Sequence, residues 1–212
     1  MAPQPRGSRT FRPLTAPAPV TVARVRQGRG GGIVSATSTE LTGVRLVPLT
    51  AHADDRGQFV EVFRDEWPLD LRPVQWNAVR SRAGVMRGVH VHVGHHDYLT
   101  VLAGTLVLGL HDLRPDSPTA GRSAMMRIDA DDPLAVSIPP GVCHGFWFPV
   151  PSVHLYGVDR YWNLADELGC QYDDPALGLD WALDTTPSLS ERDRVAPDYA
   201  TMRTAYLAAT AR

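Results

Sequence analysis

The chain has 212 residues, of which 43% are hydrophobic and 21% are charged. This composition predicts one globular domain, alone or with a tail, rather than a disordered chain. The net charge of −2 argues against a dedicated nucleic-acid-binding protein. All 21 basic residues are arginine, so the Schiff-base, phosphate-loop and general-base roles of lysine are excluded. Two cysteines are too few for a disulfide scaffold, and no apolar run is long enough to span a bilayer. We therefore expect a cytoplasmic protein without membrane or nucleic-acid partners.

The first 32 residues differ in composition from the rest of the chain. They hold six arginines, no acidic residue, and the runs APAP at 16–19 and RGGG at 29–32. Such a segment has little apolar surface to offset the entropy of ordering, so 1–32 is predicted to be a disordered arm. A nucleic-acid arm and a transit-like peptide are the alternatives to a simple extension. The folded domain is then 33–212.

Short strand-like runs dominate that domain. Runs rich in valine, leucine, phenylalanine and tyrosine recur between proline, glycine and aspartate, at 58–63, 98–103, 105–110, 134–138 and 153–158. Gly104 separates two of them, as a tight hairpin would require. Helical periodicity appears only over about 198–208, with Asp198 as a plausible N-cap. Many short strands and one terminal helix favour an all-β sandwich or barrel.

Histidines are concentrated in one segment, where His90, His92, His95 and His96 fall within seven residues. On a strand, His90 and His92 project from the same face and would converge inside a barrel. His95 and His96 are more simply explained as surface residues of a turn. His90, flanked by two valines, is either functional or a satisfied core histidine. His144 follows a Pro-Pro-Gly turn that would deliver it to the next strand.

The spacing of these residues resembles the two motifs of the cupin superfamily. Gly84, His90-x-His92, Asp97 and Gly104 match the first motif, and Pro139-x-Gly141-x-x-His144 matches the second. The resemblance implies a cupin jelly roll, a small double-stranded barrel, with a short C-terminal helix. Many cupins bind a divalent transition metal, and the matching ligands here are His90, His92, Asp97 and His144. Three imidazoles and a carboxylate suit iron, manganese, zinc or nickel.

A more detailed resemblance covers about residues 42–195. The runs that carry it are, in order, DDRGQFVEVF (54–63), QWNAVRSRAGVMRGVH (75–90), DLRPDSPTAGR (112–122), IPPGVCHGF (138–146), LYGVDRYW (155–162) and LSERD (189–193). Together they resemble the dTDP-4-dehydrorhamnose 3,5-epimerase family, which belongs to the cupin superfamily but works without a metal. The resemblance implies an isomerase of deoxysugar biosynthesis that epimerises a dTDP-4-keto-6-deoxyhexose at C3, C5 or both, without a cofactor.

The resemblance also implies roles for single residues. His90 is the expected base, Asp193 the carboxylate that orients it, and Tyr156 the proton donor on the opposite face of the sugar. Without the resemblance, Asp193 is more simply explained as an acid at a helix start, and Tyr156 is equally well explained as a barrel aromatic with its hydroxyl at the surface. The residues expected to bind the nucleotide sugar are Arg56, Glu61, Gln75, Asn77, Arg87, His144, Glu167 and Arg192. A homodimer formed by strand exchange is expected as well.

The sequence departs from the family at two positions. The family usually has glutamine where this chain has His92, and it carries a lysine that steadies the enolate oxygen where this chain has Asp97. A carboxylate there would repel an enolate, so another group must supply the positive charge, or the reaction has changed. Two alternatives to a metal-free epimerase follow. One is a metal-dependent cupin isomerase or oxygenase that uses the four cupin ligands, and the other is an inactive relative that binds the sugar nucleotide.

Overall fold

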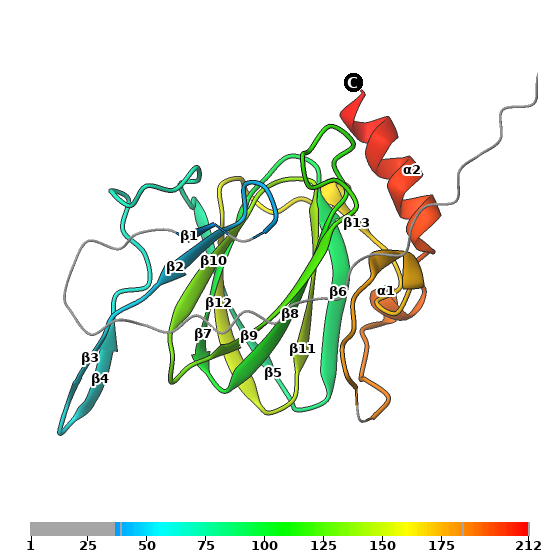
Figure 1. Cartoon of the computed structure of the whole chain (residues 1–212). Coiled ribbons are helices and arrows are strands. Elements are labelled where there is room, and N and C mark those ends of the chain that lie inside the picture. Colours follow the sequence, from blue (N-terminus) through cyan, green and yellow to red (C-terminus); the bar gives the residue numbers. More distant parts are fainter. Residues whose placement is uncertain (1–36, 39, 184, 212) are drawn as a thin grey trace, which may run out of the picture.

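The computed structural model describes residues 37–38, 40–183 and 185–211. The predicted disordered arm, 1–32, lies outside the described residues. Two antiparallel sheets that face each other make up the body of the domain (Figure 1). No helix of the described residues is long and apolar enough to cross a membrane.

The first sheet has six strands. In spatial order they are β1 (Thr37–Ser38), β2 (Arg45–Pro48), β10 (Leu134–Ile138), β7 (Asp97–Ala103), β12 (Ser152–Val158) and β5 (Gln75–Ser81). The second sheet has five strands. They are β13 (Glu167–Gly169), β6 (Val85–His92), β11 (Val142–Phe148), β8 (Thr105–Asp112) and β9 (Ser123–Asp129).

The connections give the domain its jelly-roll topology. From β5 to β12 successive strands alternate between the two sheets, except for β8 and β9, which pair with each other as neighbours. The chain therefore winds around one shared interior, and the predicted all-β cupin jelly roll with a short C-terminal helix is confirmed. The predicted hairpin at Gly104 is wrong, because β7 and β8 lie in different sheets. Gly104 is nevertheless required there: its φ is +77°, and a Cβ would lie 2.4 Å from the carbonyl oxygen of Pro151.

Two apolar layers lie on the two sides of the second sheet. Inside the barrel, Leu106, Leu108 and Leu110 of β8 pack against strands of the first sheet. On the outer side, Val89 and Val91 of β6 belong to a second cluster, which side chains of the sheet and of the C-terminal segment form together. The alternation of β6 therefore buries its valines under the C-terminal segment and directs His90 and His92 into the barrel.

The C-terminal segment covers that outer face (Figure 1). It contains the 3₁₀ turns η1 (Leu164–Asp166) and η2 (Pro175–Leu177) and the helices α1 (Glu191–Arg194) and α2 (Tyr199–Thr210). The Asp198 side chain accepts a hydrogen bond from the Thr201 amide and so caps α2, as predicted. Met202 and Tyr206 are the buried residues of α2.

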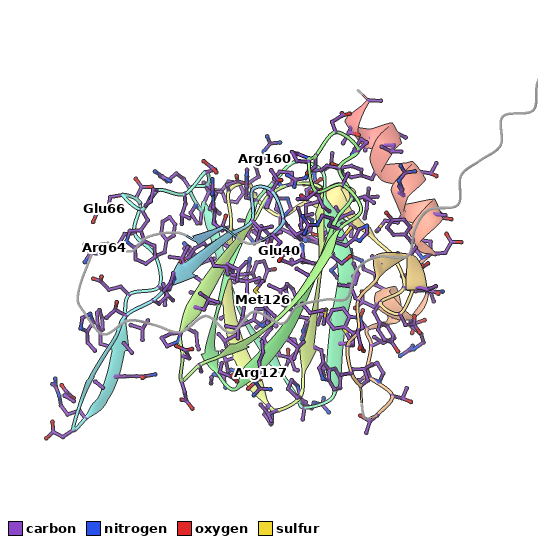
Figure 2. The ribbon with its side chains drawn as sticks, viewed as in Figure 1. Glu40, Arg64, Glu66, Met126, Arg127 and Arg160 are labelled. Atoms are coloured by element: carbon purple, nitrogen blue, oxygen red, sulfur yellow. The ribbon has the colours of Figure 1, made fainter. Side chains whose placement is uncertain are left out.

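A short hairpin stands apart from the barrel. Its strands are β3 (Ala51–Asp54) and β4 (Gly57–Val60), so the strand predicted over 58–63 ends three residues early. Figure 1 shows the hairpin projecting from the body, and Phe59 is 63% exposed, with its ring 6.4 Å from that of His52 on the paired strand. The ion pair of Arg64 and Glu66, just beyond the hairpin, also lies outside the barrel (Figure 2).

Candidate active site

A pocket of about 460 Å³ opens between the two sheets, a size suited to a small-molecule ligand. Residues of β6 and β11 line it from the second sheet, β7 and β12 from the first, and α1 with the preceding residues closes one side. All three expected catalytic residues, His90, Tyr156 and Asp193, line this pocket.

His90 and Asp193 are in direct contact. Nε2 of His90 lies 2.7 Å from Oδ1 of Asp193, although 103 residues separate them in the chain. Asp193 is held by its own helix, because Ser190 caps α1, accepts from the Asp193 amide and donates its hydroxyl to Oδ2. The two explanations for Asp193 are thus compatible: it belongs to a helix start, and that helix start faces the histidine.

The charge state of Asp193 follows from these contacts. Burial by itself would raise the pKa of Asp193, but hydrogen bonds from His90, Ser190 and the Gly88 backbone outweigh burial and lower the pKa below its usual value. Asp193 is therefore ionised at neutral pH and presents a carboxylate acceptor to Nε2 of His90.

Tyr156 lines the pocket from the opposite wall. It lies on β12 in the first sheet, whereas His90 lies on β6 in the second. Burial, followed by the nearby Asp97 and Glu167, raises the pKa of Tyr156, so the phenol keeps its proton at neutral pH. A base on one wall and a protonated phenol on the other are the two groups that inversion at a carbon requires.

The expected substrate-binding residues divide into two groups. Arg87, His144, Glu167 and Arg192 line the pocket, and Arg192 pairs with Glu167 at 2.9 Å. The other four are Arg56, Glu61, Gln75 and Asn77, and they are absent from the pocket lining of the described residues.

Two of those four residues belong to the projecting hairpin and the chain that follows it, and two to an edge strand. Arg56 lies in the hairpin turn and pairs with Asp54, and Glu61 pairs with Arg64 just beyond β4. Gln75 and Asn77 lie on β5 and bond to each other at 3.0 Å. Gln75 also accepts from the amide of Trp162, which does line the pocket.

The structure changes the expected metal-ligand set. His92, Asp97 and His144 each offer a donor atom within 4.8 Å of the others, but His90 is not in this group. The expected four ligands are therefore reduced to three, since the Nε2 of His90 faces Asp193.

The charge states of these three residues are set mainly by burial. Burial raises the pKa of Asp97 well above its usual value, and Glu167, Asp159 and Asp166 add to the effect. Burial also lowers the pKa of His144 well below its usual value, followed by the influence of His92 and His90. It lowers the pKa of His92 to about 4, with His95 as the next cause.

The predicted surface location of His95 is wrong. His95 is 3% exposed, its Nδ1 lies 2.7 Å from Oδ2 of Asp166, and its ring stacks on His92. His96 is partly exposed and pairs with Asp159 at 2.8 Å. Both carboxylates come from the segment after β12, so no local pattern around 94–96 reveals the pairing.

Sequence reasoning also missed His154 as a lining residue of the pocket. It lies two positions before Tyr156 on β12, and the period of a strand could have revealed that it shares the Tyr156 face. Its Nδ1 is buried and has no hydrogen-bond partner among the described residues, and its ring stacks on Phe148.

Known proteins identify the family. The sequence pattern of the family described as dTDP-4-dehydrorhamnose 3,5-epimerase matches residues 38–201. The chain belongs to this family. The expected family is thus confirmed, and so is the expected class of enzyme, because epimerases are isomerases.

Several members of the epimerase family are similar to this chain. The dTDP-4-dehydrorhamnose 3,5-epimerase of Neisseria gonorrhoeae is 33% identical over 73% of this chain, which spans about half (49%) of that relative's length. The Mycobacterium tuberculosis epimerase has a solved structure that is 30% identical, with a TM-score of 0.77, over 82% of this chain and 92% of that one. The Legionella pneumophila enzyme was solved in complex with dTDP-4-keto-L-rhamnose. It is 27% identical, with a TM-score of 0.74, over 80% of this chain and 96% of that one.

Proposed function

We propose that this member of the epimerase family inverts a carbon beside the ketone of a dTDP-linked 4-keto-6-deoxyhexose, as a step of deoxysugar biosynthesis. The observation that carries the proposal is the His90–Asp193 pair, closed at 2.7 Å inside the pocket and opposed by Tyr156 on the other wall. The family relationship supports the class of substrate, since a relative binds dTDP-4-keto-L-rhamnose.

His90 removes the proton. When its Nε2–H donates to Asp193, the lone pair remains on Nδ1, and this nitrogen takes the proton from the carbon. The C–H electron pair then forms a carbon–carbon double bond, and the carbonyl electrons move to oxygen to give an enolate. Asp193 stabilises the imidazolium that forms, because the charged pair is largely shielded from water.

Tyr156 returns a proton to the opposite face. Its phenol donates to the carbon, the carbonyl re-forms, and the configuration at that carbon is inverted. The imidazolium then releases its proton to solvent and the phenolate takes one up, so the enzyme is restored and the sugar is isomerised without oxidation or reduction.

Arginines bind the diphosphate in this proposal. Arg87 lines the pocket, and its Nε donates to the neutral Ser81 hydroxyl at 3.1 Å, so the guanidinium keeps donors for an anionic ligand. Arg192 lies at the pocket edge, 42% exposed and paired with Glu167. A planar guanidinium suits phosphate oxygens because it binds two of them at once.

A homodimer is part of the same proposal. The hairpin carries Arg56 away from its own pocket and exposes Phe59, which is the arrangement expected of an arm that reaches a second copy. Light scattering should give twice the 23.2 kDa of one chain, and a monomer would contradict the dimer. The cytoplasmic location stays a prediction that cell fractionation tests.

Heavy-water exchange tests the reaction. Incubated in D2O with a dTDP-4-keto-6-deoxyhexose, the protein should introduce deuterium at C3, C5 or both, and NMR identifies the position. His90→Gln should abolish deuterium uptake, whereas Tyr156→Phe should abolish inversion but keep uptake on the face of His90. Deuterium uptake by His90→Gln at the wild-type rate would rule out the proposed base.

A further inference from the structure

We propose that His92, Asp97 and His144 bind one divalent transition-metal ion beside the His90–Asp193 pair. The enolate of the proposed epimerase needs a positive group at its oxygen, and the chain has no lysine to supply one. The proposal rests on the proposed function for the role of the ion, but not for its binding. A bound divalent ion supplies a Lewis acid that polarises a carbonyl oxygen.

The spacing of the donor atoms fits a metal. Oδ2 of Asp97 lies 3.4 Å from Nε2 of His92 and 3.9 Å from Nε2 of His144. When donor atoms occupy tetrahedral positions about 2.1 Å from a metal ion, they lie about 3.4 Å from one another. The side chains are 7%, 8% and 4% exposed, so they converge inside the pocket rather than on the surface.

The backbone orients both histidine rings for this purpose. Nδ1 of His92 lies 3.4 Å from both the carbonyl oxygen of Asp166 and Oε1 of Glu167, and Nδ1 of His144 lies 3.4 Å from the carbonyl oxygen of Val142. These partners can only accept, so the hydrogen of each ring lies on Nδ1 and the lone pair of each Nε2 is directed toward Asp97. Outer contacts of this kind are the usual way in which metal-binding histidines are held.

Two lone pairs and a carboxylate that converge in a buried space repel one another unless a cation or a proton lies between them. Within the described part of the chain, the ion pairs of Asp97 are limited to these two histidines, and no arginine shares them. Two imidazoles and one carboxylate suit Fe²⁺, Mn²⁺, Co²⁺, Ni²⁺ or Zn²⁺ and leave coordination positions for substrate or water.

His90 stays outside the set, and this separates the site from the expected four-ligand one. Its Nε2 is engaged by Asp193, so metal binding and proton removal use different histidines. The neighbouring group of His92, His95 and Asp166 is the weaker candidate. The Asp166 carboxylate already accepts from the amides of Val93 and Gly94 as well as contacting His95.

Metal titration of the tag-free full chain tests the proposal without substrate. After chelator dialysis, Zn²⁺ binding is measured by calorimetry and elemental analysis, and Co²⁺ binding by its ligand-field absorption. We expect one buried ion per chain. Asp97→Asn should lower affinity by at least about 100-fold, since loss of an outer contact alone costs roughly 10- to 100-fold.

Two control variants define the ligand set. His96→Gln changes a histidine outside both candidate groups, and His90→Gln changes the one outside the proposed set, so both should bind within about threefold of wild type. Circular dichroism and a melting curve establish that each variant is folded. His92→Gln gives a second ligand variant if Asp97→Asn fails to fold.

Three results would overturn the site: no binding at about 1 mM metal, unchanged affinity in both folded ligand variants, or a loss of affinity in His90→Gln equal to that in Asp97→Asn. These failures are distinct from failure of the proposed function. Protein that binds no metal but still exchanges deuterium is a metal-free epimerase, and protein that binds metal without exchange has a different reaction.

Discussion

Replacing Asp193 with asparagine isolates the electrostatic contribution of the His90 partner. The amide has the shape of the carboxylate, and the backbone amide of residue 193 still bonds to the Ser190 cap, so helix α1 stays formed. The Ser190 hydroxyl can still donate to the amide oxygen. What the variant loses is the negative charge 2.7 Å from the His90 ring.

The size of the effect follows from burial. The side chains of His90 and Asp193 are 20% and 7% exposed, so solvent screens their interaction weakly. Breaking a buried charged pair costs about 3–5 kcal/mol. Because the imidazolium forms only once the proton is removed, most of this energy is lost from the transition state. The rate of deuterium exchange should fall roughly 10²- to 10⁴-fold.

The assay compares two carboxylates of the same short helix. Deuterium incorporation is followed by NMR for wild type, Asp193→Asn and Glu191→Gln. Glu191 is exposed, pairs only with Arg194 among the described residues, and is not part of the pocket lining, so Glu191→Gln should keep the wild-type rate. An exchange rate for Asp193→Asn within about threefold of wild type would refute the orienting role.

Three further perturbations test other parts of the structure. Asp112 is fully buried and accepts from Arg114, Ser117 and Thr119; Asp112→Ala should cost about 3–5 kcal/mol of unfolding free energy, seen as a lower urea midpoint. Burial, then Arg87, lowers the pKa of His154 to about 4, so its contribution to stability is complete above pH 6.5 and is lost as pH falls toward 4. Between pH 7 and pH 4, the unfolding free energy of His154→Phe should therefore fall by roughly 3 kcal/mol less than that of wild type, as measured by urea unfolding. Arg87→Gln should raise the Kd for dTDP roughly 10- to 150-fold in calorimetry, since a charged hydrogen bond is worth about 1.5–3 kcal/mol; an unchanged Kd would remove Arg87 from the diphosphate site.

The sequence predicted the parts of this structure that depend on local pattern. The alternation of valine and histidine in β6 predicted a shared face for His90 and His92, and Asp198 predicted the start of α2. The meeting of His90 with Asp193 came from the family resemblance, because no spacing rule joins residues 103 apart.

The parts that could not be predicted depend on partners distant in the chain. Gly104 has the features of a hairpin turn, and only the strand pairing shows that it connects two sheets. His95 lies in a polar stretch typical of an exposed turn. It is buried because Asp166, 71 residues later, approaches it, and the sequence around either residue carries no sign of this contact.

The C-terminal layer has a consequence for how the enzyme acquires its activity. Trp181, Met202 and Tyr206 pack this layer on the outer face of the second sheet, and the same layer carries Asp193, whose carboxylate contacts His90 of β6. The strands that line the pocket and carry His90 lie earlier in the chain than Asp193, so the His90–Asp193 contact depends on how the segment after the barrel packs against it. A substitution in this apolar layer should therefore lower the rate of deuterium exchange by displacing Asp193, even though it changes no residue of the pocket lining.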